Sequence, residues 1–187
     1  SLVYNSSFEL STYNGQQPEG WEIWYRSGGN GNFYVESKPD LGGAHSGDWY
    51  GMHWGSNGYD GSTYQIVKNL PNGMYRASVW VKNTPFTSST ADPCAACFVV
   101  KDFGQGSTGS GLKYVDLSAG NSEWTQVEIE DVPVTNGQMH IEIYTQAKNG
   151  TLEWIMFDDF VIEPYEYDVA VAPTENGAIA VSSEKAS

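Results

Sequence analysis

The amino-acid sequence predicts an all-β protein whose strands are antiparallel and form a sandwich or a barrel. Short runs of alternating apolar and polar residues recur along the chain, and clusters of Gly, Pro and Asn separate them. Apolar residues do not keep the i, i+3, i+4, i+7 spacing of an amphipathic helix over any long window. The length of 187 residues fits one domain with a sizeable core.

Turn-forming residues divide the chain into ten predicted strands. In chain order these strands are residues 21–25, 32–36, 48–54, 64–68, 75–82, 97–103, 113–117, 124–129, 139–146 and 153–162. The clearest turn is NLPNG at 69–73, because Pro and Gly favour turn conformations. The string GQGSTGSG at 104–111 is predicted to be a loop.

Alternation in two strands predicts which side chains face outward, because successive side chains of a strand point to opposite faces. The fifth strand is expected to bury Tyr75, Ala77, Val79 and Val81. Its outer face then carries Arg76, Ser78, Trp80 and Lys82. The ninth strand is expected to turn Met139, Ile141 and Ile143 toward the core, and His140, Glu142, Tyr144 and Gln146 toward the outer face. The alternative is that loops cover Trp80 and Tyr144, which then only pack.

Aromatic residues are more numerous than a core of this size needs. The chain has 7 Trp, 12 Tyr and 7 Phe but only 9 Lys and Arg. Several Trp alternate with apolar residues in the predicted strands, so some rings must face water. A sugar stacks its axial C–H bonds on such a ring and places its hydroxyls at the rim. The composition therefore favours a carbohydrate ligand.

The charge balance argues against two other classes of partner. The formal net charge is −14, so the chain offers no basic patch for nucleic acid or for an anionic membrane surface. The sequence contains no apolar run long enough to span a membrane. Residues 1–4 do not show the basic region and apolar run of a signal peptide, and the alternative is that processing removed one. The same charge disfavours acidic polysaccharides such as pectate, because like charges repel.

Cys94 and Cys97 form a single C-x-x-C string. Zinc would need a second pair or nearby histidines, and a redox motif would need a βαβ context. The remaining alternatives are a local disulfide in an oxidising compartment and two free thiols.

The composition changes after residue 162. Residues 170–187 are small, polar and alternating, with a predicted turn at 173–177. We therefore expect residues 1–163 to form the sandwich. Residues 164–187 are expected to be a linker or the start of a truncated following module.

Four strings, in the same order along the chain, resemble signatures of one family group. They are NSSFE at 5–9 followed by GW at 20–21, SGDWY at 46–50, LPNGMYRASVWV at 70–81 and FDDFVI at 157–162. Together they resemble carbohydrate-binding modules with the galactose-binding-like β-sandwich, including families four, nine and twenty-two. The match covers residues 2–163 and implies a jelly-roll sandwich. The string YGMHW at 50–54 is similar to a strand of family sixty-one modules, which accompany endo-galactanases and bind β-1,4-galactan.

The resemblance implies a non-catalytic module, covalently linked to a secreted, extracellular bacterial glycoside hydrolase. Its ligand is expected to be a neutral plant cell-wall polysaccharide, with β-1,4-galactan first and xylan or β-glucan next. The competing class is an adhesion or protein-interaction domain on the same sandwich.

The candidate carbohydrate-binding residues are Trp24, His53, Trp54, Trp80, Lys82, Tyr144 and Gln146. Trp80 and Trp54 are the leading predicted anchors, and Asn83 is a weaker candidate. His53 and Trp54 are neighbours, so only one of them faces a ligand in a regular strand. A bulge or a strand end would present both. The alternatives are a core histidine for His53 and an interface tryptophan for Trp54. The remaining Trp residues are assigned to packing, namely Trp21, Trp49, Trp124 and Trp154.

The resemblance also implies a structural calcium between the N-terminal segment and the last strand. Its ligands would be the side chains of Glu9 and Asp159 and backbone oxygens near Ser7 and Asp48, since calcium prefers oxygen ligands. The alternative is that Glu9 and Asp159 are ordinary surface carboxylates. No catalytic residue is expected. A glycosidase needs two facing carboxylates, and the neighbours Asp158 and Asp159 should point to opposite faces of a strand.

Overall fold

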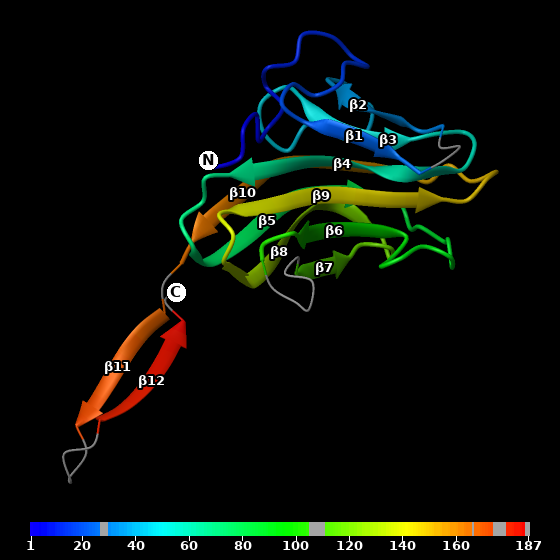
Figure 1. Ribbon diagram of the computed structural model, residues 1–187. Coiled ribbons are helices and arrows are strands. Elements are labelled where there is room, and N and C mark those ends of the chain that lie inside the picture. Colours follow the sequence, from blue (N-terminus) through cyan, green and yellow to red (C-terminus); the bar gives the residue numbers. More distant parts are fainter. Residues whose placement is uncertain (27–29, 105–110, 166, 174–178, 186–187) are drawn as a thin grey trace.

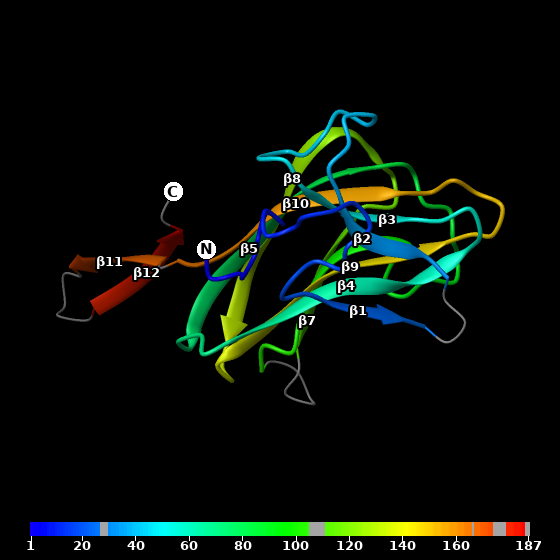
Figure 2. The ribbon, with the colours of Figure 1, turned by 90° about the horizontal axis from the view of Figure 1, so that it is seen from above.

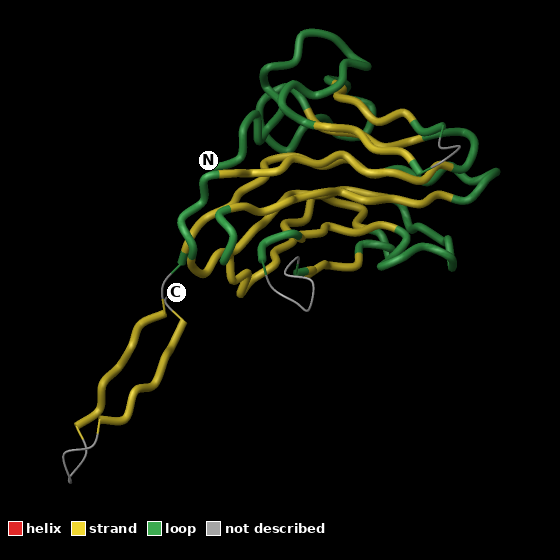
Figure 3. The backbone as a smooth tube through the Cα atoms, viewed as in Figure 1, coloured by secondary structure: helices red, strands yellow, loops and turns green. Residues whose placement is uncertain are grey.

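The computed structural model describes residues 1–26, 30–104, 111–165, 167–173 and 179–185 (Figure 1). These residues form strands, turns and loops, and Figure 3 shows no helix among them. The described part of the chain accordingly contains no helix that could span a membrane.

Two five-stranded antiparallel sheets form the sandwich, as predicted. The first sheet has the order β1-β4-β9-β6-β7, with β1 (Glu22–Tyr25), β4 (Tyr59–Lys68), β9 (Gln138–Ala147), β6 (Ala96–Lys101) and β7 (Leu112–Asp116). The second sheet has the order β2-β3-β10-β5-β8, with β2 (Asn32–Glu36), β3 (Tyr50–Trp54), β10 (Ile155–Pro164), β5 (Gly73–Asn83) and β8 (Asn121–Val134).

The core lies between the two sheets and confirms the predicted alternation. The inward residues of β5 and β9 are all buried, namely Tyr75, Ala77, Val79, Val81, Met139, Ile141 and Ile143. The N-terminal segment closes one end of this core, where Phe8 packs on Trp21, and Trp21 lies 4.6 Å from Phe160 between ring centroids. Burying one such ring stabilises the fold by about 1.5–3 kcal/mol.

Strand boundaries differ from the prediction mainly where local sequence disfavours a strand. The strand predicted at 64–68 begins at Tyr59, although Asp60 and Gly61 have low strand propensity. A Cβ on Gly61 would lie 2.3 Å from the carbonyl oxygen of Trp24. Glycine is therefore what lets β1 approach β4 this closely.

A separate hairpin follows the sandwich. Strands β11 (Tyr167–Pro173) and β12 (Ile179–Lys185) pair with each other antiparallel. Figures 1 and 2 both show this hairpin extending away from the two sheets. Most of the turn predicted at 173–177 lies outside the described residues. That residues 164–187 link to or begin another module stays a prediction.

Candidate functional site

The structure distributes the predicted carbohydrate-binding residues over three places. Trp24, Tyr144 and Gln146 lie on the outer face of the first sheet. Trp54, Trp80 and Lys82 lie on the outer face of the second sheet. His53 lies in the core between the sheets. The predicted set therefore does not form one site.

The outer face of the first sheet contains a groove of about 450 Å³, here called the first-sheet groove. Strand register builds it: Trp24 pairs with Ser62 across β1 and β4, and Ser62 pairs with Tyr144 across β4 and β9. The next row pairs Tyr64 with Glu142. The full lining is Trp24, Arg26, Ser62, Tyr64, Asp92, Pro93, Val99, Lys101, Leu112, His140, Glu142 and Tyr144.

Three aromatic side chains line this groove at different depths. Trp24 is 43% exposed, and the guanidinium of Arg26 lies 5.4 Å from its ring centroid. Tyr64 stacks on His140 with 4.7 Å between the ring centroids. Tyr144 is only 4% exposed, and its buried hydroxyl interacts with Arg26 and Asp60 without forming a well-aligned hydrogen bond to a described residue. Burial raises the pKa of Tyr144 to about 12, so the hydroxyl keeps its proton and remains a donor.

Most charged groups of the groove are paired with one another, Asp92 of the lining excepted. Lys101 Nζ donates to Glu142 Oε1 at 3.1 Å, and Glu142 Oε2 lies 3.0 Å from His140 Nε2. Burial alone would raise the pKa of Glu142, but the hydrogen bond from His140 and the charge of Lys101 outweigh it and lower the pKa. At the rim Arg26 pairs with Asp60 at 2.9 Å. The groove thus offers hydrogen-bonding groups with little net charge.

Gln146 lies beyond the rim pair rather than in the lining. Its Nε2 donates to Asp60 Oδ2 at 2.7 Å, and its Oε1 accepts from Thr90 Oγ1 at 3.0 Å and from Ser88. The amide is already occupied, so Gln146 positions Asp60 and has no group pointed at the groove.

A loop at 37–49 covers the outer face of the second sheet. The imidazole of His45 stacks on Trp80, with 3.8 Å between centroids and 15° between planes. Trp124 donates its indole N–H to the carbonyl of Gly43 at 3.3 Å. Trp54 is half-buried, packs in the cluster beneath this loop and donates to Tyr34. Trp80 does not present the free ring expected of a leading anchor, and the alternative that a loop covers it is the one observed. Tyr144 also fits that alternative in part, since it is buried and packs on Cys94 and Cys97.

His53 is a core histidine, so its expected role at the ligand is wrong. Its ring is fully buried between Thr145 Oγ1 at 2.9 Å and Thr63 Oγ1 at 2.7 Å. It also stacks on Phe33, with 3.6 Å between centroids. Burial holds the pKa of His53 well below its ordinary value. The four tryptophans assigned to packing are buried or half-buried in the hydrophobic clusters, as predicted.

The predicted calcium residues meet around one short loop. Glu9 accepts the backbone N–H of Trp49 at 2.9 Å and that of Asp48 at 3.1 Å. Asp159 accepts from Ser46 Oγ at 2.7 Å and contacts His45 Nδ1 at 2.6 Å. No group of three or more His, Cys, Asp or Glu side chains in the described ranges is arranged to hold a metal ion.

Asp158 and Asp159 do not point to opposite faces, which corrects the expectation for a regular strand. The register of β10 shifts between Asp158 and Val161, and Asp159 has a left-handed φ of 52°. Asp158 Oδ2 accepts the backbone N–H groups of His45 at 3.0 Å and Ser46 at 3.1 Å, so both aspartates contact the same loop. Burial raises the pKa of Asp158 to about 8.

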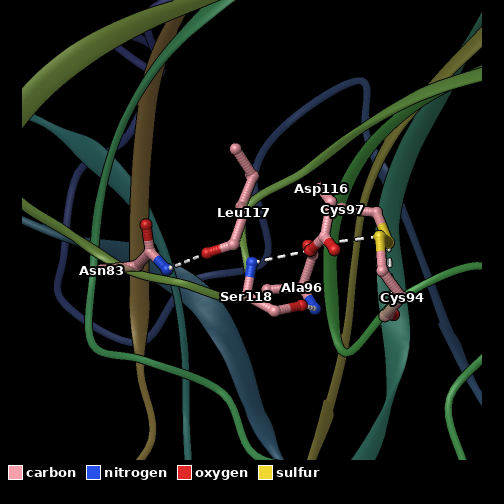
Figure 4. Close-up of a disulfide and its surroundings, with 7 residues drawn as sticks. All are labelled: Asn83, Cys94, Ala96, Cys97, Asp116, Leu117 and Ser118. Carbon is pink, nitrogen blue, oxygen red and sulfur yellow. Dashed lines mark hydrogen bonds between the residues drawn. A yellow bond between two sulfur atoms is a disulfide. The ribbon is translucent and has the colours of Figure 1, made fainter.

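A disulfide supports one wall of the first-sheet groove. Cys94 and Cys97 are bonded, which is the first of the two alternatives left by the sequence (Figure 4). Both pack with Val99 and Tyr144 in one buried cluster. The bond lies next to Asp92 and Pro93, which line the groove, so it restrains this wall.

Sequence reasoning missed several groove residues, above all Arg26, Tyr64 and Lys101. The outward positions of His140 and Glu142 were predicted from alternation. What was lacking was the register between β4, β9 and β6, which places Tyr64 and Lys101 beside them.

Comparison with known proteins places the fold in one class. No protein-family model matches the chain. The chain is 26% identical over 157 residues to a 1,6-α-glucosyltransferase from Sporosarcina globispora; the match covers 81% of this chain and 11% of the relative. The chain thus corresponds to about a tenth of that protein's length.

Solved structures are similar over almost the whole sandwich. TmCBM61 in complex with β-1,4-galactotriose has a TM-score of 0.63 and 21% identity, covering 87% of this chain and 97% of its own. A family 16 carbohydrate-binding module has a TM-score of 0.57 and 14% identity, covering 87% and 99%. The K2 cleaved adhesin domain of Lys-gingipain has a TM-score of 0.55 and 18% identity, covering 82% and 95%. The chain therefore has the β-sandwich fold of carbohydrate-binding modules, a fold that an adhesin domain shares.

Proposed function

We propose that this chain is a non-catalytic carbohydrate-binding module and that it holds a polysaccharide in the first-sheet groove. The observation that carries the proposal is the composition of this groove, where the rings of Trp24 and Tyr64 lie beside the hydrogen-bonding side chains of Arg26 and Glu142. Ring faces suit the C–H surface of a sugar, and the polar groups beside them suit its hydroxyls.

The ligand is neutral. The cationic side chains of the groove are each paired with a carboxylate, Lys101 with Glu142 and Arg26 with Asp60, and the lining also carries the carboxylate of Asp92. An acidic chain would meet a protein of net charge −14 without a free cationic cluster in the groove to offset the repulsion.

β-1,4-Galactan is the first candidate ligand, with xylan and β-glucan next. Support for galactan comes from the fold shared with TmCBM61, which was solved with β-1,4-galactotriose. The string at 50–54 gives no support through ligand contacts, since His53 is buried and Trp54 packs. An α-1,6-linked glucan is a further candidate, supported by a different comparison, because the sequence relative is a 1,6-α-glucosyltransferase.

The parent protein is proposed to be a secreted or cell-surface bacterial enzyme, with a glycoside hydrolase as the linked catalytic module. The match to a small fraction of a much longer enzyme supports a modular parent. The disulfide between Cys94 and Cys97 supports an oxidising compartment, where such bonds persist.

A calcium ion is also proposed, bound by Glu9 and Asp159 with backbone oxygens near Ser7 and Asp48. Both carboxylates reach the same 45–49 loop, one from the N-terminal segment and one from β10, and they supply the oxygen ligands that calcium prefers. The ion would join the beginning of the sandwich to its last strand and so stabilise the fold.

Isothermal titration with galactan, xylan, barley β-glucan, an α-1,6-glucan and polygalacturonate tests the proposed ligand. One of the neutral chains should bind most tightly and polygalacturonate most weakly. Tightest binding to polygalacturonate would overturn the charge argument. If none of the five polysaccharides binds, the competing class of adhesion domain is favoured. An apolar protein-binding patch must then be found on the surface.

A further inference from the structure

A second pocket, of about 690 Å³, lies on the other side of the sandwich. It lies at the C-terminal end of β5. Its walls are the segments 40–42, 82–85 and 119–122, together with Trp154. Its lining shares no residue with that of the first-sheet groove. It is called the second-sheet pocket below.

Hydrogen bonds fix the walls of this pocket in place. Lys82 Nζ donates to the carbonyl of Leu41 at 2.7 Å and so attaches the 37–49 loop to β5. The buried amide of Asn83 donates to the carbonyl of Leu117 at 2.9 Å, as Figure 4 shows, and accepts from Asn121 Nδ2 at 2.9 Å. Thr84 Oγ1 accepts the backbone N–H of Trp154 at 2.9 Å. The pocket is therefore preformed, as ligand sites usually are.

The chemistry of the lining matches that of the first-sheet groove. Trp154 is half-buried and supplies an aromatic wall. Lys82 and Asp40 contribute one charge of each sign. Asn121 Oδ1 and Ser122 Oγ make no hydrogen bond with another described residue, so they are available to a ligand. An indole beside balanced charges and unpaired polar atoms suits a neutral saccharide.

We propose that the second-sheet pocket binds a second neutral saccharide, as a short oligosaccharide or a chain end, and makes the module bivalent. Only the class of ligand rests on the proposed function of the groove. Because the two sites lie on opposite sheets, one short oligosaccharide cannot span them, and each chain binds two molecules. On an insoluble polysaccharide, two sites raise the apparent affinity above that of either alone.

Two-dimensional NMR of the seven tryptophan indole N–H groups tests this proposal. β-1,4-Galactotriose, xylotriose, cellotriose and isomaltotriose are titrated separately into the wild-type chain and into Trp24→Ala, Trp154→Phe and Lys82→Met. The sugar that shifts the Trp24 signal should also shift that of Trp154. Lys82→Met, which keeps most of the side chain's length, should weaken the Trp154 response about tenfold and leave that of Trp24 unchanged. Trp154→Phe assigns the Trp154 signal, and fully buried Trp21 reports that each variant is folded.

The outcomes separate the two sites. A Trp154 response that persists in Trp24→Ala supports the second site. A silent Trp154 with a responding Trp24, or a Trp154 response that vanishes in Trp24→Ala, overturns the second site and leaves the groove. A responding Trp154 with a silent Trp24 overturns the groove and supports the pocket. If neither signal responds to any of the four sugars, both proposals fail.

Discussion

Tyr144 is the residue whose environment distinguishes a ligand role from a packing role. Its hydroxyl is buried in the groove lining, and no described residue completes a hydrogen bond to it. Buried polar groups in folded proteins are almost always paired, and an unpaired one carries a desolvation cost. A ligand that displaces Asp60 from the hydroxyl would complete this hydrogen bond.

Tyr144→Phe should therefore separate binding from stability. Removing an unpaired hydroxyl should leave the free energy of unfolding unchanged or slightly higher, as measured by chemical denaturation. Affinity for the groove's ligand should fall by about 0.5–1.5 kcal/mol, the value of one hydrogen bond. The control is Tyr13→Phe, which alters an exposed ring that does not belong to the lining. Unchanged affinity would assign Tyr144 to packing, and a clear loss of stability would show that the fold itself uses the hydroxyl.

His53 shows what a core histidine does to the pH dependence of stability. The folded protein keeps His53 neutral, because burial lowers its pKa, whereas the unfolded chain takes up a proton near pH 6.5. The unfolded state therefore binds more protons, and stability falls as the pH drops below about 6.5.

We expect His53 to contribute a loss of about 1.4 kcal/mol for each pH unit below 6.5, which is the linkage value for one proton. The raised pKa of Asp158 contributes a change of opposite sign in this range, so the loss is measured as the difference between the wild type and His53→Gln in denaturant unfolding at pH 7 and pH 5. His53→Gln should be less stable at pH 7, because it disturbs the contacts with Thr63 and Thr145, but should lose less on acidification than the wild type. Equal losses in the two proteins would show that another group controls this range.

At the scale of elements, the 37–49 loop decides which tryptophan on the outer faces is left uncovered. Alternation correctly predicted the facing of Trp80 and of Tyr144, and it treats the two strands alike. The difference arises from contacts far apart in sequence, since His45 covers Trp80 and Leu41 binds Lys82. Local patterns carry no information about such contacts. For this reason the prediction from the sequence named Trp80 rather than Trp24 as a leading anchor.

The irregularity in β10 is a second feature that the sequence did not reveal. Two adjacent aspartates in an apolar run fit a regular strand, in which their side chains diverge. The bulge and the left-handed conformation of Asp159 turn both toward the 45–49 loop. Strained backbone of this kind often marks a functional position.

Calcium should stabilise the protein through this position. A protein stripped with chelator and then given calcium at about 100 times its Kd should gain about 2.7 kcal/mol. For a chain of this length that gain raises the Tm by roughly 5–10 °C, measured by calorimetry. Glu9→Gln and Asp159→Asn should abolish the increase, while Glu123→Gln, an exposed carboxylate on β8, should keep it. A Tm that does not respond to calcium in demonstrably metal-free protein contradicts the proposal.

For the whole molecule, the antiparallel sandwich was predictable because its signals are local. Alternation, turn residues and the order of four short strings all depend on near neighbours in sequence, and the inward residues of β5 and β9 were correct as predicted. The candidate site was predictable only in part. Trp24 and Tyr144 share a groove, but strand register adds Tyr64 and Lys101, and packing removes His53.

The central claim is that carbohydrate binds on the first sheet, and affinity gel electrophoresis of three variants tests it most directly. The gels contain whichever polysaccharide titration selects. Trp24→Ala should lower the affinity for the polysaccharide, measured from gel retention, by about 1–3 kcal/mol, roughly 5- to 150-fold. The reason is that the substitution removes an exposed ring from the groove. Trp80→Ala, whose ring lies under His45, and Tyr13→Ala, an exposed ring elsewhere, should be retained like the wild type. Full retention of folded Trp24→Ala together with loss of retention in folded Trp80→Ala would contradict the claim and place the site on the second sheet.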